Sequence, residues 1–210
     1  MTTPTIASAA SAANANATAA ALDRRQFLGA AGALTLGLSL AGREAAAATV
    51  TTAAVNSWLV IGSDDSITLT IGSSDMGQGS FAGLGQILCE DLMVSPTRVT
   101  LVQGGPTLAT PAPVGTAILT AGSGVTRNNY WKLRDAGAAA REMLVAAAMA
   151  RVGDASRSSY AVAEGVVVHT PSGTRLRYGE LAAAAALQPV PVGVPLVPDD
   201  QLRCIGKTFA

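Results

Sequence analysis

The feature that most constrains the fold is a long alanine-rich segment in the second half of the chain. It reads NNYWKLRDAGAAAREMLVAAAMARVG, begins between Gly124 and Asn129, and stops at Gly153. Alanine and unbranched side chains favour a helix, and glycine commonly ends one. Because alanine is small, this helix can approach a neighbouring element closely. We expect it to be the longest helix of the protein.

A predicted hairpin and a shorter helix precede that segment. The apolar, β-branched runs Trp58–Ile61 and Ile67–Ile71 flank a Gly-Ser-Asp-Asp turn, which indicates a β-hairpin. Leucine and isoleucine then recur at helical spacing as far as Met93, and Pro96 is placed to stop that helix. The following RVTLVQG alternates like a strand. This order predicts an α+β fold, with a mixed or antiparallel sheet layer packed by two main helices.

The segments from residue 104 onwards, apart from the long helix, carry weaker patterns. Residues 104–121 are rich in proline and small residues, which predicts a long loop, either ordered or disordered. After Gly153, YAVAEGVVVHTPSGTRLRYGELAAAAAL predicts a strand containing His169, a Pro-Ser-Gly turn, another strand and a short helix. We therefore delimit an α+β domain at 55–187, followed by a proline-rich linker at 188–210.

The amino-terminal part of the chain has the composition of a targeting segment. Residues 1–22 are low in complexity and predict a disordered leader. Residues 23–48 combine a paired arginine, an apolar run and an Ala-x-Ala pattern near Ala46, which resembles a twin-arginine export signal. The apolar run covers roughly 15 residues, fewer than a spanning helix needs, although a membrane anchor is the alternative. We expect export to the periplasm, by a route that carries folded, often cofactor-loaded proteins.

Charge and cysteine content exclude several classes of protein. The chain has 14 basic and 14 acidic residues and a net charge of zero, so nothing attracts a nucleic-acid backbone. Cys89 and Cys204 are far apart in sequence and have no neighbouring Cys or His at ligand spacing. A zinc knuckle, an iron–sulfur cluster of the chain's own and a disulfide scaffold are therefore excluded.

Two glycine-rich loops, DMGQGS at Asp75–Ser80 and LTAGSGVT at Leu119–Thr126, precede the two predicted helices. A helix amino terminus carries unsatisfied N–H groups and partial positive charge, so it suits an anionic ligand. Glycine lets a ligand approach the backbone, Ser123 and Thr126 add hydroxyl donors, and the amide of Gln78 suits the edge of a heterocycle.

A purely structural alternative is that these glycines form turns and that Ser80 or Ser123 caps a helix. Other nucleotide-binding motifs fit poorly. GQGSFAG has the spacing G-x-G-x-x-x-G, and the next strand ends in Gln103 where a dinucleotide fold would have an acid. Neither loop is followed by the lysine of a phosphate-binding P-loop.

Five blocks in order resemble a known family: SITLTIGSSDMGQGSFAGLGQILCEDL, RVTLVQG, TAGSGVTRNNYWKLRDAGAAAREMLVAAAMARVG, GVVVHTPSGTRLRYGELAAAAA and LRCIGK. They are similar to the amino-terminal region of the large, molybdopterin-binding subunit of isoquinoline 1-oxidoreductase. Related membrane-associated aldehyde dehydrogenases of the xanthine oxidase family share this pattern. The resemblance covers nearly all of 55–207 and implies a partial molybdopterin-binding domain.

The resemblance implies a molybdenum hydroxylase that uses molybdopterin cytosine dinucleotide. Its partners would be the remainder of the molybdenum subunit, a small iron–sulfur subunit that holds the clusters and, in some relatives, a cytochrome. The segment Met76, Gly77, Gln78 and Gly79 would contact the pterin, with Gln78 supplying the amide. The phosphate region of the cofactor would meet Gly122 and Ser123, with neighbouring Ala121 and Gly124.

Two departures from the family pattern matter. The family more often has glutamate where this chain has Asp75, and its catalytic glutamate lies near a distant carboxyl terminus that this sequence does not contain. We do not expect a replacement base among Glu90, Glu142, Glu164 and Glu180, which we interpret as solvated helix or strand residues. The chain is therefore predicted to be inactive alone. An exported, non-catalytic binding or interaction module is the alternative function.

Overall fold

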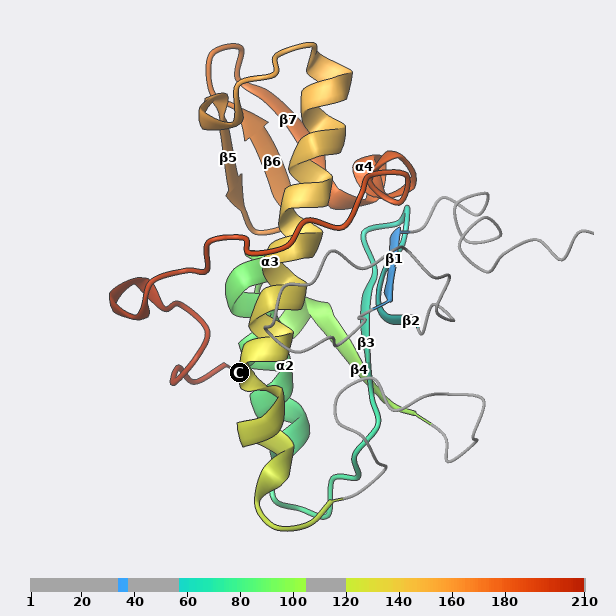
Figure 1. Cartoon of the computed structure of the whole chain (residues 1–210), viewed down its shortest axis with the longest axis vertical. Coiled ribbons are helices and arrows are strands. Elements are labelled where there is room, and N and C mark those ends of the chain that lie inside the picture. Colours follow the sequence, from blue (N-terminus) through green and yellow to red (C-terminus); the bar gives the residue numbers. More distant parts are fainter. Residues whose placement is uncertain (1–33, 38–56, 105–119, 210) are drawn as a thin grey trace, which may run out of the picture.

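The computed structural model describes residues 34–37, 57–104 and 120–209 (Figure 1). The strands are β1 (Leu34–Gly37), β2 (Ser57–Ile61), β3 (Ile67–Ile71), β4 (Val99–Gln103), β5 (Tyr160–Ala163), β6 (Val166–His169) and β7 (Thr174–Arg177). The helices are α2 (Ser80–Leu92), α3 (Gly124–Val152) and α4 (Tyr178–Ala185). The predicted α+β class is confirmed. The predictions for residues 1–22 and most of 104–121 lie outside the described residues.

The larger sheet is mixed, in the order β1-β2-β3-β4. The predicted hairpin is β2 and β3, whose turn is closed by the Gly62 N–H donating to the Ser66 carbonyl at 2.8 Å. Strand β4 pairs parallel to β3, with α2 as the crossover between them. Such a crossover returns the chain beside the strand that it left, so the loop before α2 emerges at the carboxyl edge of β3.

Strand β1 is a part of this sheet that the sequence pattern did not predict. It pairs antiparallel to β2, with Leu34 opposite Ile61. These four residues belong to the apolar run that resembles an export signal, and the rest of that run lies outside the described residues. A short apolar run fits an edge strand as well as an export signal, so composition alone does not distinguish these two interpretations.

Helix α3 runs along most of the length of the described molecule, and α2 packs beside it (Figure 1). It begins and ends where the sequence predicts, with Gly153 in the left-handed conformation at φ 84°. The helices approach closely at Gly137, where a Cβ atom would lie 2.5 Å from the Leu88 carbonyl oxygen and 2.9 Å from the Leu92 nitrogen. Glycine is therefore required at this crossing.

The second sheet contains three antiparallel strands, in the order β5-β6-β7, where the sequence analysis predicted two. The prediction missed a two-residue turn at Glu164 and Gly165, whose φ values are 48° and 76°. Positive φ at both central residues suits a tight hairpin but is unusual for glutamate. Tertiary contacts hold Glu164 there, because its carboxylate accepts the Ser95 N–H and its carbonyl accepts Arg98.

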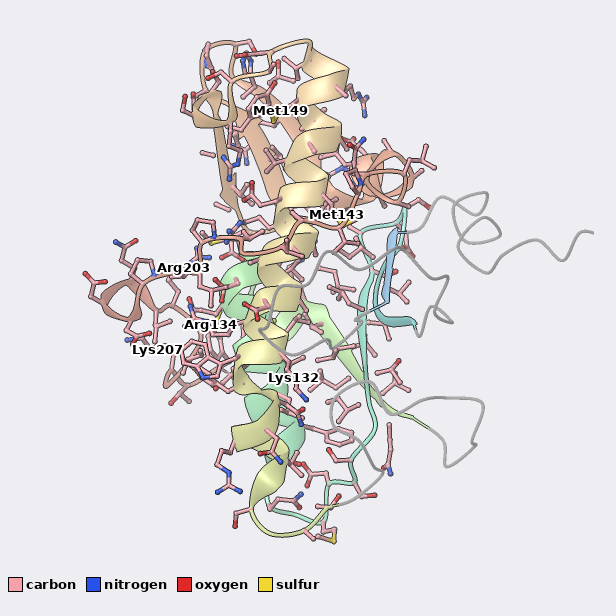
Figure 2. All side chains as sticks on the ribbon, in the orientation of Figure 1. Lys132, Arg134, Met143, Met149, Arg203 and Lys207 are labelled. Atoms are coloured by element: carbon pink, nitrogen blue, oxygen red, sulfur yellow. The ribbon has the colours of Figure 1, made fainter. Side chains whose placement is uncertain are left out.

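The segment 195–205, which we call the strap, contains Arg203 and crosses the side of α3 that carries Arg134 (Figure 2). Its backbone is bound by two buried acids at the end of α2. Glu90 accepts the N–H groups of three consecutive residues, Arg203, Cys204 and Ile205, at 2.8–3.0 Å. The interpretation of Glu90 as a solvated residue was wrong, since it has no exposed surface.

The neighbouring acid, Asp91, fixes the strap at a second point. Asp91 accepts the Val197 N–H and the Arg134 Nε–H, each at 2.6 Å, and Arg134 also donates to the Val197 carbonyl. Arg141 donates to the carbonyls of Asp91 and Pro195. This part of the predicted linker is therefore packed against the domain, because buried charges need several hydrogen-bond partners and the strap backbone supplies them.

Candidate functional site

The two glycine-rich loops meet at one end of the molecule, where α2 and α3 both begin (Figure 1). They line a single cleft of about 540 Å³. The first loop contributes Met76 and residues 78–80, and the second contributes residues 120–126. Seven of the eight residues predicted to meet a cofactor line this cleft, and Gly77 lies between two of them. Tertiary structure thus joins loops that are about forty residues apart in sequence.

The first loop already holds an anion of its own, Asp75. The Asp75 carboxylate accepts the N–H of Phe81 at 3.1 Å and that of Gly77 at 2.8 Å. These backbone donors lower the pKa of Asp75, because they stabilise its charged form. Gly77 and Gly79 adopt φ values of 93° and 72°, which allow the loop to wrap around the carboxylate. The Asp75 carboxylate therefore partly neutralises the positive charge at the amino end of α2.

The side chain of Gln78 is engaged in the same loop. Its Oε1 accepts the Met76 N–H at 2.5 Å, and its Nε2 donates to the Ser74 carbonyl and to Ser80 Oγ, both at 3.0 Å. Both amide protons are thus in use, whereas Oε1 keeps a second lone pair. In this conformation, Gln78 shapes the loop and offers a ligand one acceptor.

The second loop leaves its helix end open. Ser123, the residue preceding α3, has φ 53° and makes no capping hydrogen bond through its side chain. The first turn of α3 contains no acidic residue. A Cβ atom at Gly122, which has φ 61°, would meet nothing within 4 Å, so the backbone there faces open space. This end of the cleft presents unneutralised helix donors, which suits an anionic group.

Sequence analysis missed Thr120 as a member of the site. Its hydroxyl accepts the Ser74 N–H at 2.8 Å and donates to the Ser74 carbonyl at 3.2 Å. These bonds connect the second loop to the first. Thr120 lies within the second glycine-rich loop, but nothing in the sequence indicates that its hydroxyl contacts Ser74, and only the folded arrangement brings the two together.

The described parts of the chain contain no group of three or more His, Cys, Asp or Glu residues that could hold a metal ion. Cys89 and Cys204 are free and buried, and desolvation raises the pKa of Cys204 to about 11. A buried thiol of this kind packs as an apolar group. Over the same described residues, no helix is long and apolar enough to cross a membrane.

The fold places two helix amino termini and exposed glycine backbone around one cleft of an α+β domain. The family model described as "Molybdopterin cofactor-binding domain" matches residues 25–200. The chain therefore belongs to the molybdopterin cofactor-binding domain family.

The chain is 33% identical to the isoquinoline 1-oxidoreductase subunit beta of Brevundimonas diminuta over 173 residues. That match covers 78% of this chain and 22% of the relative, so the chain spans about a fifth of the relative's length. A solved structure, quinoline 2-oxidoreductase from Pseudomonas putida 86, matches with a TM-score of 0.44 and 19% identity. That structural match covers 69% of this chain and 17% of the quinoline 2-oxidoreductase chain.

Proposed function

We propose that this chain is the amino-terminal, cofactor-binding portion of a molybdenum hydroxylase that oxidises aldehydes or N-heterocycles with oxygen from water. The observation that carries the proposal is the shared cleft, because both loops with exposed glycine backbone open onto it. Membership of the molybdopterin-binding family identifies the class of ligand. The domain's own task is to bind and orient that ligand.

The two sides of the cleft suit different parts of molybdopterin cytosine dinucleotide. The open amino end of α3, with Gly122 and Ser123, would hold the phosphate region. The first loop already contains the Asp75 charge, so it would face the uncharged pterin edge, with Gln78 offering its free acceptor. A wide cleft and glycines without Cβ atoms fit a bulky group of this kind. When bound, the cofactor supplies the two-electron redox chemistry of the hydroxylation.

The base that such a hydroxylation requires is not among the four glutamates considered above. Glu90 binds the strap, Glu142 accepts Arg157 at 2.6 Å, Glu164 accepts Ser95, and Glu180 accepts the Arg177 N–H. None of the four lines the cleft. We therefore propose that turnover depends on the remainder of a molybdenum subunit. A small iron–sulfur subunit would receive the electrons, with a cytochrome as a further acceptor.

We also propose export to the periplasm by the twin-arginine route. Cleavage near Ala46–Ala48 would remove β1 and leave β2 at the edge of the sheet. The intact mass of the protein recovered from the periplasm therefore tests both export and the position of cleavage. A periplasmic protein that starts near Thr49 would support cleavage, whereas recovery only from the cytoplasm would contradict export.

Substitution of Gly79 tests cofactor binding directly. In the assembled enzyme, Gly79→Val should lower molybdenum and pterin content, because the new side chain projects from a backbone that borders the cleft. Gln78→Ala should also lower it, since the first loop loses three hydrogen bonds. Gly153→Val is the matched control: Gly153 has a similar φ of 84° and open surroundings, but lies at the far end of α3.

Unchanged molybdenum content and turnover in both loop variants would contradict the proposal. If Gly153→Val lowered molybdenum content equally, backbone strain would explain the loss, and this result would also contradict the proposal. An assembled enzyme without molybdopterin, in a host that produces it, would favour a non-catalytic binding or interaction module.

A further inference from the structure

Ser74 and Thr120 form a two-point connection between the loops that border the cleft. The Thr120 hydroxyl accepts the Ser74 N–H at 2.8 Å and donates to the Ser74 carbonyl at 3.2 Å. A threonine hydroxyl has one proton and two lone pairs, so it can do both at once. Within the described residues, both hydrogen bonds that join residues 73–80 to residues 120–126 belong to this hydroxyl.

Ser74 is in turn attached to the sheet and to the first loop. Its Oγ accepts Gln103 Nε2 at 3.0 Å, and Gln103 is the last residue of β4. Its carbonyl also accepts Gln78 Nε2 at 3.0 Å. The positions of the sheet edge, the Gln78 amide and the second loop are thus linked through one residue. Thr120 is the last step of that chain of contacts.

The second loop depends on this connection because its own residues are small. Ala121, Gly122 and Ser123 follow Thr120 directly, and Gly122 has open space where a side chain would be. Within this turn, a backbone hydrogen bond joins the Gly124 N–H to the Ala121 carbonyl, at 3.2 Å. Packing of α2 on α3 fixes the helices, but the loop ahead of α3 needs a fixed point on the other wall of the cleft.

We infer that Thr120 is a positioning residue, whose hydroxyl sets the distance between the two walls of the cleft so that one ligand can meet both. The inference rests on the proposed function for the identity of that ligand, molybdopterin. It does not make Thr120 a ligand contact. A bidentate tie of this kind loses both bonds together when the hydroxyl is removed.

The test compares Thr120→Val, which keeps the shape and removes the hydroxyl, with Thr120→Ser, which keeps the hydroxyl. Two quantities are measured: hydrogen exchange at the Ser74 amide in the full chain without cofactor, and molybdopterin content of the assembled enzyme. We expect Thr120→Val to speed Ser74 exchange and to lower cofactor content, each roughly five- to tenfold. Thr120→Ser should restore both. Thr100→Val, at an exposed threonine on β4, is the control.

Each outcome decides the inference. If the exchange rate of the Ser74 amide is unchanged in Thr120→Val, the Thr120 hydroxyl does not hold the two loops together, whatever the ligand is. Faster exchange at the Ser74 amide in Thr120→Val, with unchanged molybdopterin content, also contradicts the positioning role. If Gly79→Val still lowers molybdopterin content in that case, the proposed function stands without a role for Thr120. If the unsubstituted assembly holds no molybdopterin, the proposed function fails, and the exchange measurement still shows whether the hydroxyl joins the loops. Loss in Thr120→Val with recovery in Thr120→Ser supports the inference.

Discussion

The two ends of helix α2 use polar groups in opposite ways. At the carboxyl end, Glu90 and Asp91 are fully buried, and their oxygens are bound by the strap and by Arg134. At the amino end, Asp75 and Gln78 are exposed, and the backbone around Gly79 borders an open cleft. The first end fixes the domain, and the second leaves space for a ligand.

This difference shows how one helix pair serves both stability and binding. Buried charges stabilise only when every partner is present, so loss of one partner is costly. Exposed loops contribute little to global stability, and strained backbone is tolerated there because it positions groups for a ligand. Substitutions at the strap should therefore change unfolding, whereas substitutions at the cleft should change binding.

The largest expected effect is at the carboxyl end of α2, where Asp91 binds the strap. Asp91→Ala leaves Arg134 buried without its carboxylate, and we expect a loss of about 3–5 kcal/mol in the free energy of unfolding. Urea denaturation of the chain measures it. The control is Asp199→Ala, which removes an exposed carboxylate 3.6 Å from the same arginine and should cost less than about 1 kcal/mol. Equal effects of the two substitutions would contradict the stabilising role of the buried Asp91–Arg134 pair.

Gly137 tests how closely α3 packs against the last turns of α2. Gly137→Ala places a Cβ atom within 2.5 Å of backbone on α2, so we expect a loss of about 1–3 kcal/mol. Gly83→Ala makes the same change on α2 where nothing lies within 4 Å, and should stabilise by about 0.5–1 kcal/mol. Thermal or urea unfolding gives both values. Stabilisation by both substitutions would contradict the close crossing.

Ser123 tests whether strain is stored at the cleft. Ser123→Gly relieves a left-handed φ of 53° and should raise the free energy of unfolding by about 1 kcal/mol. Ser123→Ala removes the same hydroxyl but keeps the strain, so its stability should not rise. Both substitutions should lower molybdopterin content in the assembled enzyme if the hydroxyl binds phosphate. A rise in stability with Ala as well would contradict the assignment of strain.

The smallest effect concerns acid and the first loop. The folded-state pKa of Asp75 lies below its usual 3.8, so its stabilising contribution is complete above that value and is lost as the pH falls through the folded pKa. Amide exchange at Gly77 and Phe81, corrected for intrinsic rates, should therefore increase below about pH 4. Asp75→Asn should remove this pH dependence. The control is Asp64→Asn, which removes a carboxyl with a lowered pKa from the β2–β3 turn and should leave this pH dependence unchanged.

Much of the fold could be predicted because its signals are local. The β2–β3 hairpin, the helix before Pro96 and the limits of α3 follow from alternation, helical spacing and glycine stops. The turn at Glu164 could not be predicted, because glutamate accepts a positive φ there only through its contacts with Ser95 and Arg98. The same holds for β1, whose apolar residues also fit an export signal.

The candidate site divides in the same way. Glycine content and position before two helices indicated both loops and the kind of ligand they suit. The sequence could not show that the Gln78 amide would bond within its own loop, nor that Thr120 would meet Ser74. Such bonds depend on distances between segments that only the folded chain brings together.

The sequence by itself determined where the helices begin, which backbone is left bare by glycine, and which charges the chain carries. These are properties of neighbouring residues, and short-range sterics and hydrogen bonding decide them. The tertiary structure decided that the two loops face one cleft, that Asp75 neutralises only one of its walls, and that Glu90 and Asp91 are buried beneath the strap. Those outcomes follow from the close crossing of α2 and α3, since packing sets which distant groups share an environment.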